Sequence, residues 1–488
     1  MSTKYIKLNP TNRDVCGDPR SKRILLILLA ALTLIAGCSL LFACNKNNDD
    51  PLKNLPCYEL TATLDGDVLT VSQEVLYVAP ANVKGIVFNV YANAFADNAI
   101  DISSAQINRK TVDFEIYGED NTLLKLSYSA RKGQSLNIYF KYTVTLPKSD
   151  TRLGRTARGS YNLACFYPVV AKYENGYRED CYHDFGDPFY HDISSFYVNL
   201  TLDKDFDVAC SGEVVDTRLV TVDGKEKKTV EIEAEYIRDF AMTVGKLNGV
   251  SDTVKIGNNS VAVNYFYIED PFPALTLERI KSSLTVFSEA FGNYPYKYYT
   301  VAQSNLSDAG GMEYGSFVTV SILKSRDEYL DTITHETAHQ WWYNLVGNDQ
   351  INSAWLDEGL TEFCTYYYHY LTGDRGKFND EMTSISRSYS AFAAHKFDVG
   401  FDGSMNRPLS SYLTDGEYVA VSYFKGAMLF NTLRELVGDN KFQSAMQRYC
   451  KDNRYRIANA ASLISAFKTV GYDVKGIVNG FVEDTVVM

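Results

Sequence analysis

The chain has 488 residues, more than one hydrophobic core normally supports, so we expect two or more domains. Hydrophobic residues make up 45% and charged residues 22% of the sequence, which excludes a disordered or collagen-like protein. The 60 acidic and 48 basic side chains give a net charge of -12, which repels phosphate backbones and argues against nucleic-acid binding.

An uncharged segment near the N-terminus is the first element along the chain. Residues 24–44 carry no charged side chain. As a helix of about 30 Å they would match the hydrocarbon thickness of a bilayer. Lys22 and Arg23 stand directly before this segment, so the positive-inside rule predicts that residues 1–23 are cytoplasmic. We therefore predict a membrane anchor at residues 24–44, followed by a linker at residues 45–56 and an extracytoplasmic remainder.

The same segment can also be interpreted as a lipoprotein signal. Cys38 follows Ile-Ala-Gly and Cys44 follows Leu-Phe-Ala, and both resemble a bacterial lipobox. The residues leave the choice between a signal anchor and lipidation open, and both predict attachment to the cell membrane. An extracytoplasmic location permits disulfides, and Cys165 with Cys181 is the first pair to test.

Short runs of alternating polar and apolar residues occupy the region 57–250. Val68 to Val78, Ser135 to Thr145 and Ser195 to Leu202 are examples, and a period of two is typical of strands with one buried face. Turn sequences such as Asp65-Gly66 separate the runs, and no long helical period intervenes. We therefore predict an antiparallel all-β domain over residues 57–250.

The pattern changes after about residue 251, where apolar residues recur with the helical period of about 3.6. The runs with this period are Leu275 to Phe291, Arg326 to Val346, Ala354 to Leu371, Lys425 to Val437 and Lys441 to Asp452. Two predicted strands, Tyr298 to Gln303 and Phe317 to Ile322, precede the second of these helices. We expect a mainly helical α+β domain over residues 251–488, so the fold class is multidomain α+β.

One of these predicted helices contains the motif H-E-x-x-H, from His335 to His339. Ser325 suits the N-cap of this helix, and Gly347 suits its C-terminal end. On a helix, His335 and His339 lie one turn apart, so both imidazoles can reach a single metal ion. Chance would produce this motif in well under ~1% of such chains, so we interpret it as a metal site.

A metal ion at this motif needs a third protein ligand, because zinc prefers four ligands and a catalytic site leaves one position open. Glu358 is the candidate, since it follows His339 after 18 intervening residues and lies on the next predicted helix. An antiparallel return of that helix would bring its carboxylate to the metal. Two imidazoles and one carboxylate suit zinc, so we predict one Zn2+ per chain, held by His335, His339 and Glu358.

Glu336 points to another side of the helix than its two neighbouring histidines, so it cannot bind the same ion. It remains close enough to take a proton from a water on the metal, and we predict that Glu336 is the general base. Zinc lowers the pKa of that water and polarises a carbonyl group, and Glu336 can then pass the proton to the departing amine. The residues therefore predict a zinc-dependent peptidase.

Together these motifs resemble the aminopeptidase N and leukotriene hydrolase family of zinc metallopeptidases, which are gluzincins. The 18-residue gap before Glu358 matches this family, and Gly310 to Glu313 is similar to its Gly-x-Met-Glu stretch. Tyr423 to Gly426 is similar to its Tyr-Glu-Lys-Gly element, and Gly186 to Tyr190 looks like bacterial members. The resemblance implies a short two-domain member of bacterial type, with a β-saddle domain followed by a thermolysin-like catalytic domain.

By this resemblance, the carboxylate of Glu313 would hold the free α-amine of a peptide on an edge strand. Gly310, Gly311 and Met312 would lie along the substrate backbone, and Tyr423 would stabilise the oxyanion of the tetrahedral intermediate. These roles imply a membrane-anchored aminopeptidase that removes N-terminal residues from extracytoplasmic peptides.

The sequence departs from the family pattern near the expected amine site. Tyr314 stands where many relatives have asparagine, and the Gln-x-Glu element that helps to grip the amine in many relatives is missing. A zinc endopeptidase on the same scaffold therefore stays open as an alternative. A catalytically inactive peptide-binding surface protein is the alternative from another class, and turnover of peptides would exclude it.

Overall fold

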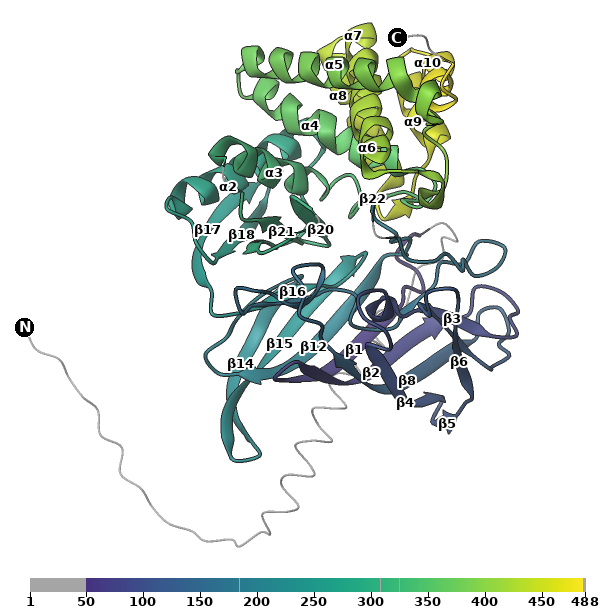
Figure 1. Cartoon of the computed structure of the whole chain (residues 1–488), viewed down its shortest axis with the longest axis vertical. Coiled ribbons are helices and arrows are strands. Elements are labelled where there is room, and N and C mark those ends of the chain that lie inside the picture. The colour runs from purple at the N-terminus through teal and green to yellow at the C-terminus, as the bar shows by residue number, and fades with distance from the viewer. Residues whose placement is uncertain (1–49, 184, 308, 324, 486–488) are drawn as a thin grey trace, which may run out of the picture. The chain divides into compact units, whose positions relative to one another are not determined.

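The computed structural model describes residues 50–183, 185–307, 309–323 and 325–485 (Figure 1). The predicted anchor at residues 24–44, with Cys38 and Cys44, lies outside the described residues. Within the described ranges, no helix has the length and apolar character needed to cross a membrane. Residues 55–488 group into one compact unit, which contains every element discussed below.

An eight-stranded sheet is the largest element of the N-terminal half. Alternate side chains of its long strands are buried, which places one face against the core. Its order is β14 (Glu213–Val222), β15 (Lys225–Ile237), β12 (Ser194–Asp203), β1 (Cys57–Asp65), β2 (Val68–Val78), β8 (Ser135–Thr145), β4 (Ile100–Ile107) and β5 (Lys110–Thr111). The neighbours are antiparallel, as predicted, except that β1 and β12 are parallel. This pair is possible because the long chain between the two strands provides the crossover that parallel pairing requires.

Two four-stranded sheets complete this half. Their orders are β13 (Asp207–Cys210), β16 (Met242–Gly245), β10 (Tyr161–Leu163), β9 (Leu153–Arg155), and β11 (Val169–Val170), β3 (Ile86–Asn89), β7 (Leu123–Leu126), β6 (Phe114–Tyr117). Phe88 of β3 packs edge-on against Phe140 of β8, with ring centroids 5.0 Å apart, and so joins the second small sheet to the large one. Cys165 and Cys181 are both free thiols, so the disulfide considered above is not formed.

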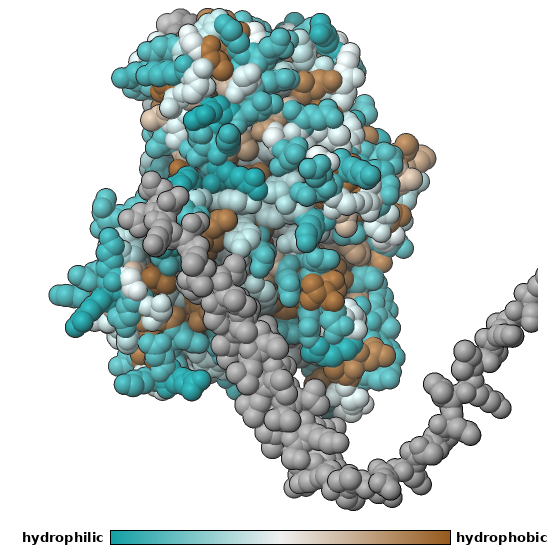
Figure 2. Space-filling view, turned by 180° about the vertical axis from the view of Figure 1, so that it is seen from behind, coloured by the Kyte–Doolittle hydropathy of each residue, from teal (hydrophilic) through white to brown (hydrophobic). Residues whose placement is uncertain are grey.

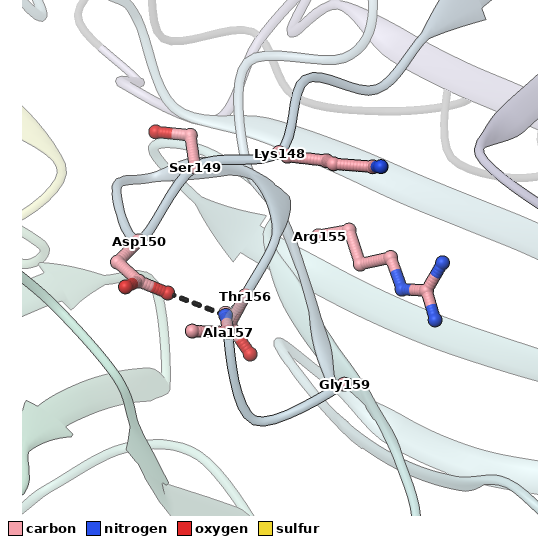
Figure 3. Close-up of a pocket in the computed structure, with 7 residues that line it drawn as sticks. All are labelled: Lys148, Ser149, Asp150, Arg155, Thr156, Ala157 and Gly159. Atoms are coloured by element: carbon pink, nitrogen blue, oxygen red, sulfur yellow. Dashed lines mark hydrogen bonds between the residues drawn. The ribbon is translucent and has the colours of Figure 1, made fainter.

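A hollow of about 480 Å³ opens in the N-terminal half (Figure 3). It is lined by Lys148, Ser149, Asp150, Arg155, Thr156, Ala157 and Gly159. The carboxylate of Asp150 accepts a hydrogen bond from the main-chain N–H of Ala157 at 2.7 Å, and Arg155 pairs with Asp67 at 3.4 Å. The carboxylate of Asp150 and the guanidinium of Arg155 are therefore both bonded to other parts of the chain.

The C-terminal half begins with a five-stranded sheet. Its order is β17 (Asn248–Ile256), β18 (Asn259–Tyr267), β19 (Tyr298–Ser304), β21 (Phe317–Ser321) and β20 (Gly311–Tyr314). The predicted strands at β19 and β21 are confirmed. Strand β20 lies at the edge of this sheet and pairs antiparallel with β21, which agrees with the edge strand that the resemblance implied.

Helices form most of the remaining C-terminal half, and this arrangement confirms the predicted α+β class (Figure 1). They are α2 (Pro273–Phe291), α3 (Arg326–Ala338), α4 (Glu358–Leu371), α5 (Arg375–Val399), α6 (Asp415–Tyr418), the π-helix η4 (Val419–Lys425), α7 (Gly426–Val437), α8 (Asp439–Asn453), α9 (Ala460–Thr469) and α10 (Lys475–Val482). Single turns at η1 (Tyr91–Ala94), η2 (Ala354–Leu356) and η3 (Leu409–Ser411), and the short pair β22 (Val346–Gly347) and β23 (Arg456–Ile457), complete the elements. In Figure 1, α2 and α3 lie on one side of the five-stranded sheet, and the later helices lie beyond them.

Helix α3 is shorter than the sequence predicts. It ends at Ala338 rather than near Gly347. Ser325 caps its start as predicted and accepts a hydrogen bond from the N–H of Glu328 at 3.3 Å. After His339, three N–H groups donate to carbonyls five residues earlier, and they belong to Asn344, Leu345 and Val346. The apolar side chains of this wider turn are buried as they would be on a helix, so the apolar periodicity did not mark the helix end.

Arg238 joins the two halves beside Gly347. Its buried side chain donates hydrogen bonds to the main-chain carbonyls of His191, Tyr343 and Arg456. A Cβ atom on Gly347 would lie 2.2 Å from the guanidinium carbon of Arg238. Glycine at position 347 therefore provides the space that the arginine occupies.

Replacement of Arg238 by methionine should destabilise the protein, because three main-chain carbonyl groups lose their donor, and two of these hydrogen bonds are fully buried. An unsatisfied buried group costs about 1–3 kcal/mol, so the free energy of unfolding should fall by at least about 2 kcal/mol in urea denaturation. Arg218→Met is the control, because the Arg218 side chain is 50% exposed. Its effect should stay below about 1 kcal/mol, and equal losses in the two variants would contradict the assigned role of Arg238.

Candidate active site

Helices α3 and α4 lie side by side in antiparallel directions, as predicted for the third ligand. The hydroxyl oxygen of Thr361 lies 3.2 Å from Nδ1 of His339, and that of Thr365 lies 3.1 Å from Nδ1 of His335. The residue numbers on α4 thus rise as those on α3 fall. This pairing places Glu358, in the first turn of α4, beside both histidines.

The three predicted ligands form one compact group. Nε2 of His335 and Nε2 of His339 are each 3.4 Å from Oε2 of Glu358, and the two nitrogens are 3.2 Å apart. Atoms bound tetrahedrally at about 2.0–2.1 Å from one ion are separated by about 3.3–3.4 Å. Oε2 of Glu358 is buried and accepts no hydrogen bond from the described residues. The donor types and their spacing therefore fit a single zinc ion.

Each histidine is oriented through its other ring nitrogen. Nδ1 of His339 lies 3.0 Å from the carbonyl oxygen of Trp342, so Nδ1 carries the proton and Nε2 presents its lone pair. Nδ1 of His335 lies 3.3 Å from the carboxylate of Glu362. These contacts direct both Nε2 atoms towards Glu358.

Charge compensation inside the group is strong. Burial alone would raise the pKa of Glu358, but its contacts with His335 and His339 outweigh burial and hold that pKa well below its usual range. Burial alone would lower the pKa of His335, but Glu358 and Glu362 raise it to about 9. The surrounding carboxylates therefore favour positive charge at the centre of the group.

Glu336 projects from α3 towards the edge strand β20. Its side chain is buried, and Oε2 has no hydrogen-bond partner in the part of the chain that the structure describes. A Cβ atom on Gly311 would lie 2.4 Å from Oε1 of Glu336, so glycine at position 311 leaves room for the carboxylate. Burial raises the pKa of Glu336 to about 7, which suits a group that both accepts and releases a proton.

Glu313 of β20 lies close to the same centre. One side-chain oxygen of Glu313, one of Glu336 and one ring nitrogen of His339 all lie within 4.8 Å of one another. Burial, and after it the carboxylate of Asp187, raise the pKa of Glu313 well above its usual range. A buried carboxyl group of this kind ionises most readily when a cation lies beside it.

All of the predicted site residues line one cavity of about 920 Å³. They are Gly310, Gly311, Met312, Glu313, His335, Glu336, His339, Glu358 and Tyr423. Strand β20 therefore forms one wall of the cavity, and helices α3 and α4 form another. The sequence motifs are brought together although they lie far apart in the chain.

Tyr423 reaches the cavity from the π-helix η4, which the sequence analysis did not predict. Its ring stacks on that of His335, with centroids 6.0 Å apart and an interplanar angle of 11°. Tyr418 also lines the cavity, and its ring centroid is 5.8 Å from that of Tyr423. Side chains five residues apart share a face on a π-helix but not on an α-helix, so the wide turn presents both phenols together.

Two glycines bring α4 into backbone contact with η4 and with the start of α7. A Cβ atom on Gly359 would lie 2.5 Å from Cα of Gly426 and 2.7 Å from the carbonyl oxygen of Ser422. A Cβ atom on Gly426 would lie 2.6 Å from Cα of Gly359. This close approach allows Glu358 and Tyr423 to face the same cavity.

Asp187 and Arg152 reach the cavity from the N-terminal half. Nη2 of Arg152 lies 2.7 Å from Oδ1 of Asp187, and both side chains are nearly buried. Burial raises the pKa of Asp187 to about 8, although Arg152 opposes this shift. Resemblance to bacterial relatives had marked the segment Gly186 to Tyr190, but no local signal assigned a role to either residue.

Gln350 is a further residue that the sequence analysis missed. Its Nε2 donates to Oε1 of Glu313 at 3.1 Å and to Oδ2 of Asp357 at 2.6 Å. Asn348 donates to the other oxygen of Asp357 at 3.0 Å. One buried amide thus connects Glu313 to the residue that precedes the predicted ligand Glu358. Such a bridge between distant segments has no signature in a single sequence.

A helix bearing H-E-x-x-H, a carboxylate from the next helix and an unpartnered glutamate between them define the class of single-metal hydrolase centres. The comparison with protein families agrees, because residues 275–481 match the Peptidase family M1 domain. This match covers less than half of the chain and agrees with the resemblance drawn from the motifs.

Similar proteins extend this match. Tricorn protease-interacting factor F2 of Thermoplasma acidophilum is 23% identical over 79% of this chain and 48% of its own length. Aminopeptidase 2 of Candida albicans is 22% identical over 90% of this chain and 50% of its own length. The chain thus spans about half the length of these two relatives. A solved M1 zinc metallopeptidase from Deinococcus radiodurans shares the fold, with a TM-score of 0.67 and 19% identity over 89% of this chain and 95% of that chain.

Replacement of Gly359 by alanine should destabilise the protein, because the added methyl group overlaps the backbone of Gly426. Overpacking of this kind costs about 1–3 kcal/mol, which thermal or urea unfolding can measure. Gly476→Ala is the control, since Gly476 also lies in a helix and, apart from its chain neighbours and the backbone of its own helix, no atom lies within 4 Å of the position that its added Cβ would take. Alanine favours a helix by roughly 0.5–1 kcal/mol, so the control should be neutral or slightly stabilised. A similar loss in the free energy of unfolding for both variants would contradict the proposed contact.

Proposed function

We propose that the chain is a zinc-dependent aminopeptidase that removes N-terminal residues from peptides. The observation that carries this proposal is the buried carboxylate of Glu313 within 4.8 Å of Glu336 and His339. A free α-ammonium group would be attracted to that carboxylate, which places the first peptide bond of the substrate beside the general base. The names of the relatives, an aminopeptidase and an M1 zinc metallopeptidase, support it.

The residues divide the reaction between them. His335, His339 and Glu358 would hold a zinc ion, which supplies a Lewis acid that polarises a carbonyl group and lowers the pKa of a water. Glu336 would take a proton from the attacking water through its unpartnered Oε2 and deliver it to the departing amine. The hydroxyl of Tyr423 would donate to the oxyanion as it develops.

The edge strand β20 would align the substrate. Gly310, Gly311 and Met312 line the cavity beside Glu313. Strand β20 is paired with β21 along one edge, and its other edge is not paired within the sheet. An extended peptide can therefore add to this edge through main-chain hydrogen bonds. The glycines let the peptide approach the backbone closely.

Asp187 would supply a second carboxylate for the α-amine. It lines the same cavity as Glu313, and it contributes to the raised pKa of Glu313, so the two groups are close. Arg152 holds Oδ1 of Asp187 and so fixes the orientation of the carboxylate. Asp187 would thereby replace the Gln-x-Glu element that the sequence lacks.

We further propose that residues 24–44 attach the chain to the cell membrane, with the peptidase domain outside the cytoplasm. The uncharged segment and the preceding Lys22 and Arg23 support this location. Release of the chain from washed membranes by high salt alone would contradict attachment through this segment.

The decisive assay uses the full-length chain in detergent, a peptide with a free N-terminus and its N-acetylated twin. Only the free peptide should lose its first residue, and a zinc chelator should stop the reaction. Glu336→Gln should lower kcat by a factor of at least about 1000, because the proton acceptor is lost. Glu313→Ala should mainly raise KM for the free peptide.

Other outcomes of this assay have definite meanings. Internal cleavage of both peptides would favour the endopeptidase. No cleavage of any peptide by folded, zinc-loaded protein would favour the peptide-binding protein. Removal of the first residue at an equal rate from both peptides would contradict the role of Glu313.

Replacement of Gln350 by methionine should weaken the binding of free N-termini, because Glu313 loses a hydrogen bond that fixes its carboxylate. We expect KM for the unblocked peptide to rise about tenfold with a smaller change in kcat, as one lost charge-assisted hydrogen bond implies. Gln443→Met is the control, since Gln443 donates to Tyr367 at 3.2 Å and does not line the cavity. Equal changes in the two variants would indicate a purely structural effect.

A further inference from the structure

The cavity continues beyond the metal site along α3. The residues of this helix that line it extend from His339 through Glu336, His335 and Thr332 to Glu328. Glu328 precedes His335 by seven residues, which corresponds to about 10 Å along a helix axis. Helix α4 runs antiparallel beside it and lines the same stretch with Glu362, Thr365 and Tyr366. The cavity therefore has room on the side of His335 that faces away from Glu313.

The two ends of the cavity have different roles if the proposed function holds, and the inference rests on that function. Glu313 lies near His339, at the C-terminal end of α3, whereas Glu328 lies in the first turn of that helix. A peptide with its amine at Glu313 and its first peptide bond at Glu336 must continue towards Glu328. An extended chain advances about 3.3 Å per residue, so this stretch accommodates about three residues after the cleaved bond.

Three glutamates line this downstream stretch, and they come from three helices. They are Glu328 of α3, Glu362 of α4 and Glu381 of α5. Burial, and then the carboxylates of Glu362 and Glu381, raise the pKa of Tyr366 above its usual range, so both carboxylates lie near one phenol. No described lysine or arginine forms an ion pair with any of the three glutamates.

Positive charge on the cavity wall is scarce by comparison. Asp331 lines the same stretch, but its carboxylate is already bonded to His369 at 2.9 Å and to Lys377 at 2.7 Å. Among the described lining residues the one lysine or arginine is Arg152, and it is paired with Asp187. Glu362 lies 3.3 Å from Nδ1 of His335, whereas Glu328 and Glu381 have no ion-pair partner among the described residues, so the downstream stretch carries an excess of negative charge.

We propose that this downstream stretch selects peptides that carry lysine or arginine within the three residues after the cleaved bond. A cationic side chain there gains attraction from the glutamates, in a concave site that screens charges less than open water. An acidic side chain at the same positions is repelled. On the face shown in Figure 2, hydrophobic side chains occur in small groups among hydrophilic ones.

The test compares three peptides that share their first two residues, Ala-Ala, and continue with Lys-Lys, Ser-Ser or Glu-Glu. At low salt, kcat/KM for the lysine peptide should exceed that for the glutamate peptide by at least about tenfold. Raising the salt to about 0.5 M should reduce this ratio, because added ions screen the attraction. The double variant Glu328→Gln with Glu381→Gln should reduce the ratio of the two kcat/KM values at least threefold.

A matched control removes the same number of charges from neighbouring positions. Asp327 and Asp380 precede the two glutamates on the same helices, are exposed and do not line the cavity. The double variant Asp327→Asn with Asp380→Asn changes the net charge equally, so the ratio should stay as in the unaltered chain. A ratio near one in the unaltered chain, or an equal fall in both double variants, would overturn the proposal.

Binding measurements separate this inference from the proposed function. The Glu336→Gln chain, loaded with zinc, should bind the lysine peptide at least about tenfold more tightly than the glutamate peptide in calorimetry. Such a preference supports the inference even if the unaltered chain cleaves none of the peptides, a result that would contradict only the peptidase. Equal dissociation constants would contradict the charge preference whether or not cleavage occurs.

Discussion

The backbone contact between Gly359 and Gly426 is the constraint on which the rest of the site depends. Glu358 directly precedes the first glycine, and Tyr423 lies three residues before the second, so one close approach fixes both side chains. The same helix α4 holds the two histidines of α3 through the hydroxyls of Thr361 and Thr365. The predicted metal ligand, the predicted general base and the predicted oxyanion donor therefore share one frame, which requires that positions 359 and 426 lack a side-chain methyl group.

The site concentrates buried negative charge. Asp187, Glu313, Glu336, Asp357 and Glu358 are all nearly buried, and an unpaired buried charge is costly. The fold offsets this cost with Arg152 at Asp187, with the amides of Gln350 and Asn348 at Asp357, and with the two imidazoles at Glu358. The carboxyl groups that remain without compensation favour the binding of cations, because a bound cation stabilises their ionised form.

Much of this structure could be predicted from the sequence, because its signals are local. The strands Val68 to Val78 and Ser135 to Thr145 have the predicted bounds, and the motif from His335 to His339 with Glu358 predicted three residues that the structure brings together. Periodicity did not mark the end of α3, since its apolar residues are buried in the wider turn as well. Helix α5 was missed, although Phe378, Met382, Ile385 and Tyr389 recur at helical spacing and are buried, because polar residues dominate between them. Asp187 and Gln350 act through contacts with distant segments, which a single sequence does not encode locally.

The joint formed by Arg238 also limits how the two halves could be recombined. The arginine comes from the N-terminal half, but it is held by Tyr343 and Arg456 of the C-terminal half and fits only beside Gly347. The two halves are therefore not independent modules that recombination could exchange freely. A chimaera of two such chains would form this contact only if one half supplied arginine at position 238 and the other supplied glycine at position 347. These two positions therefore restrict which halves can be combined.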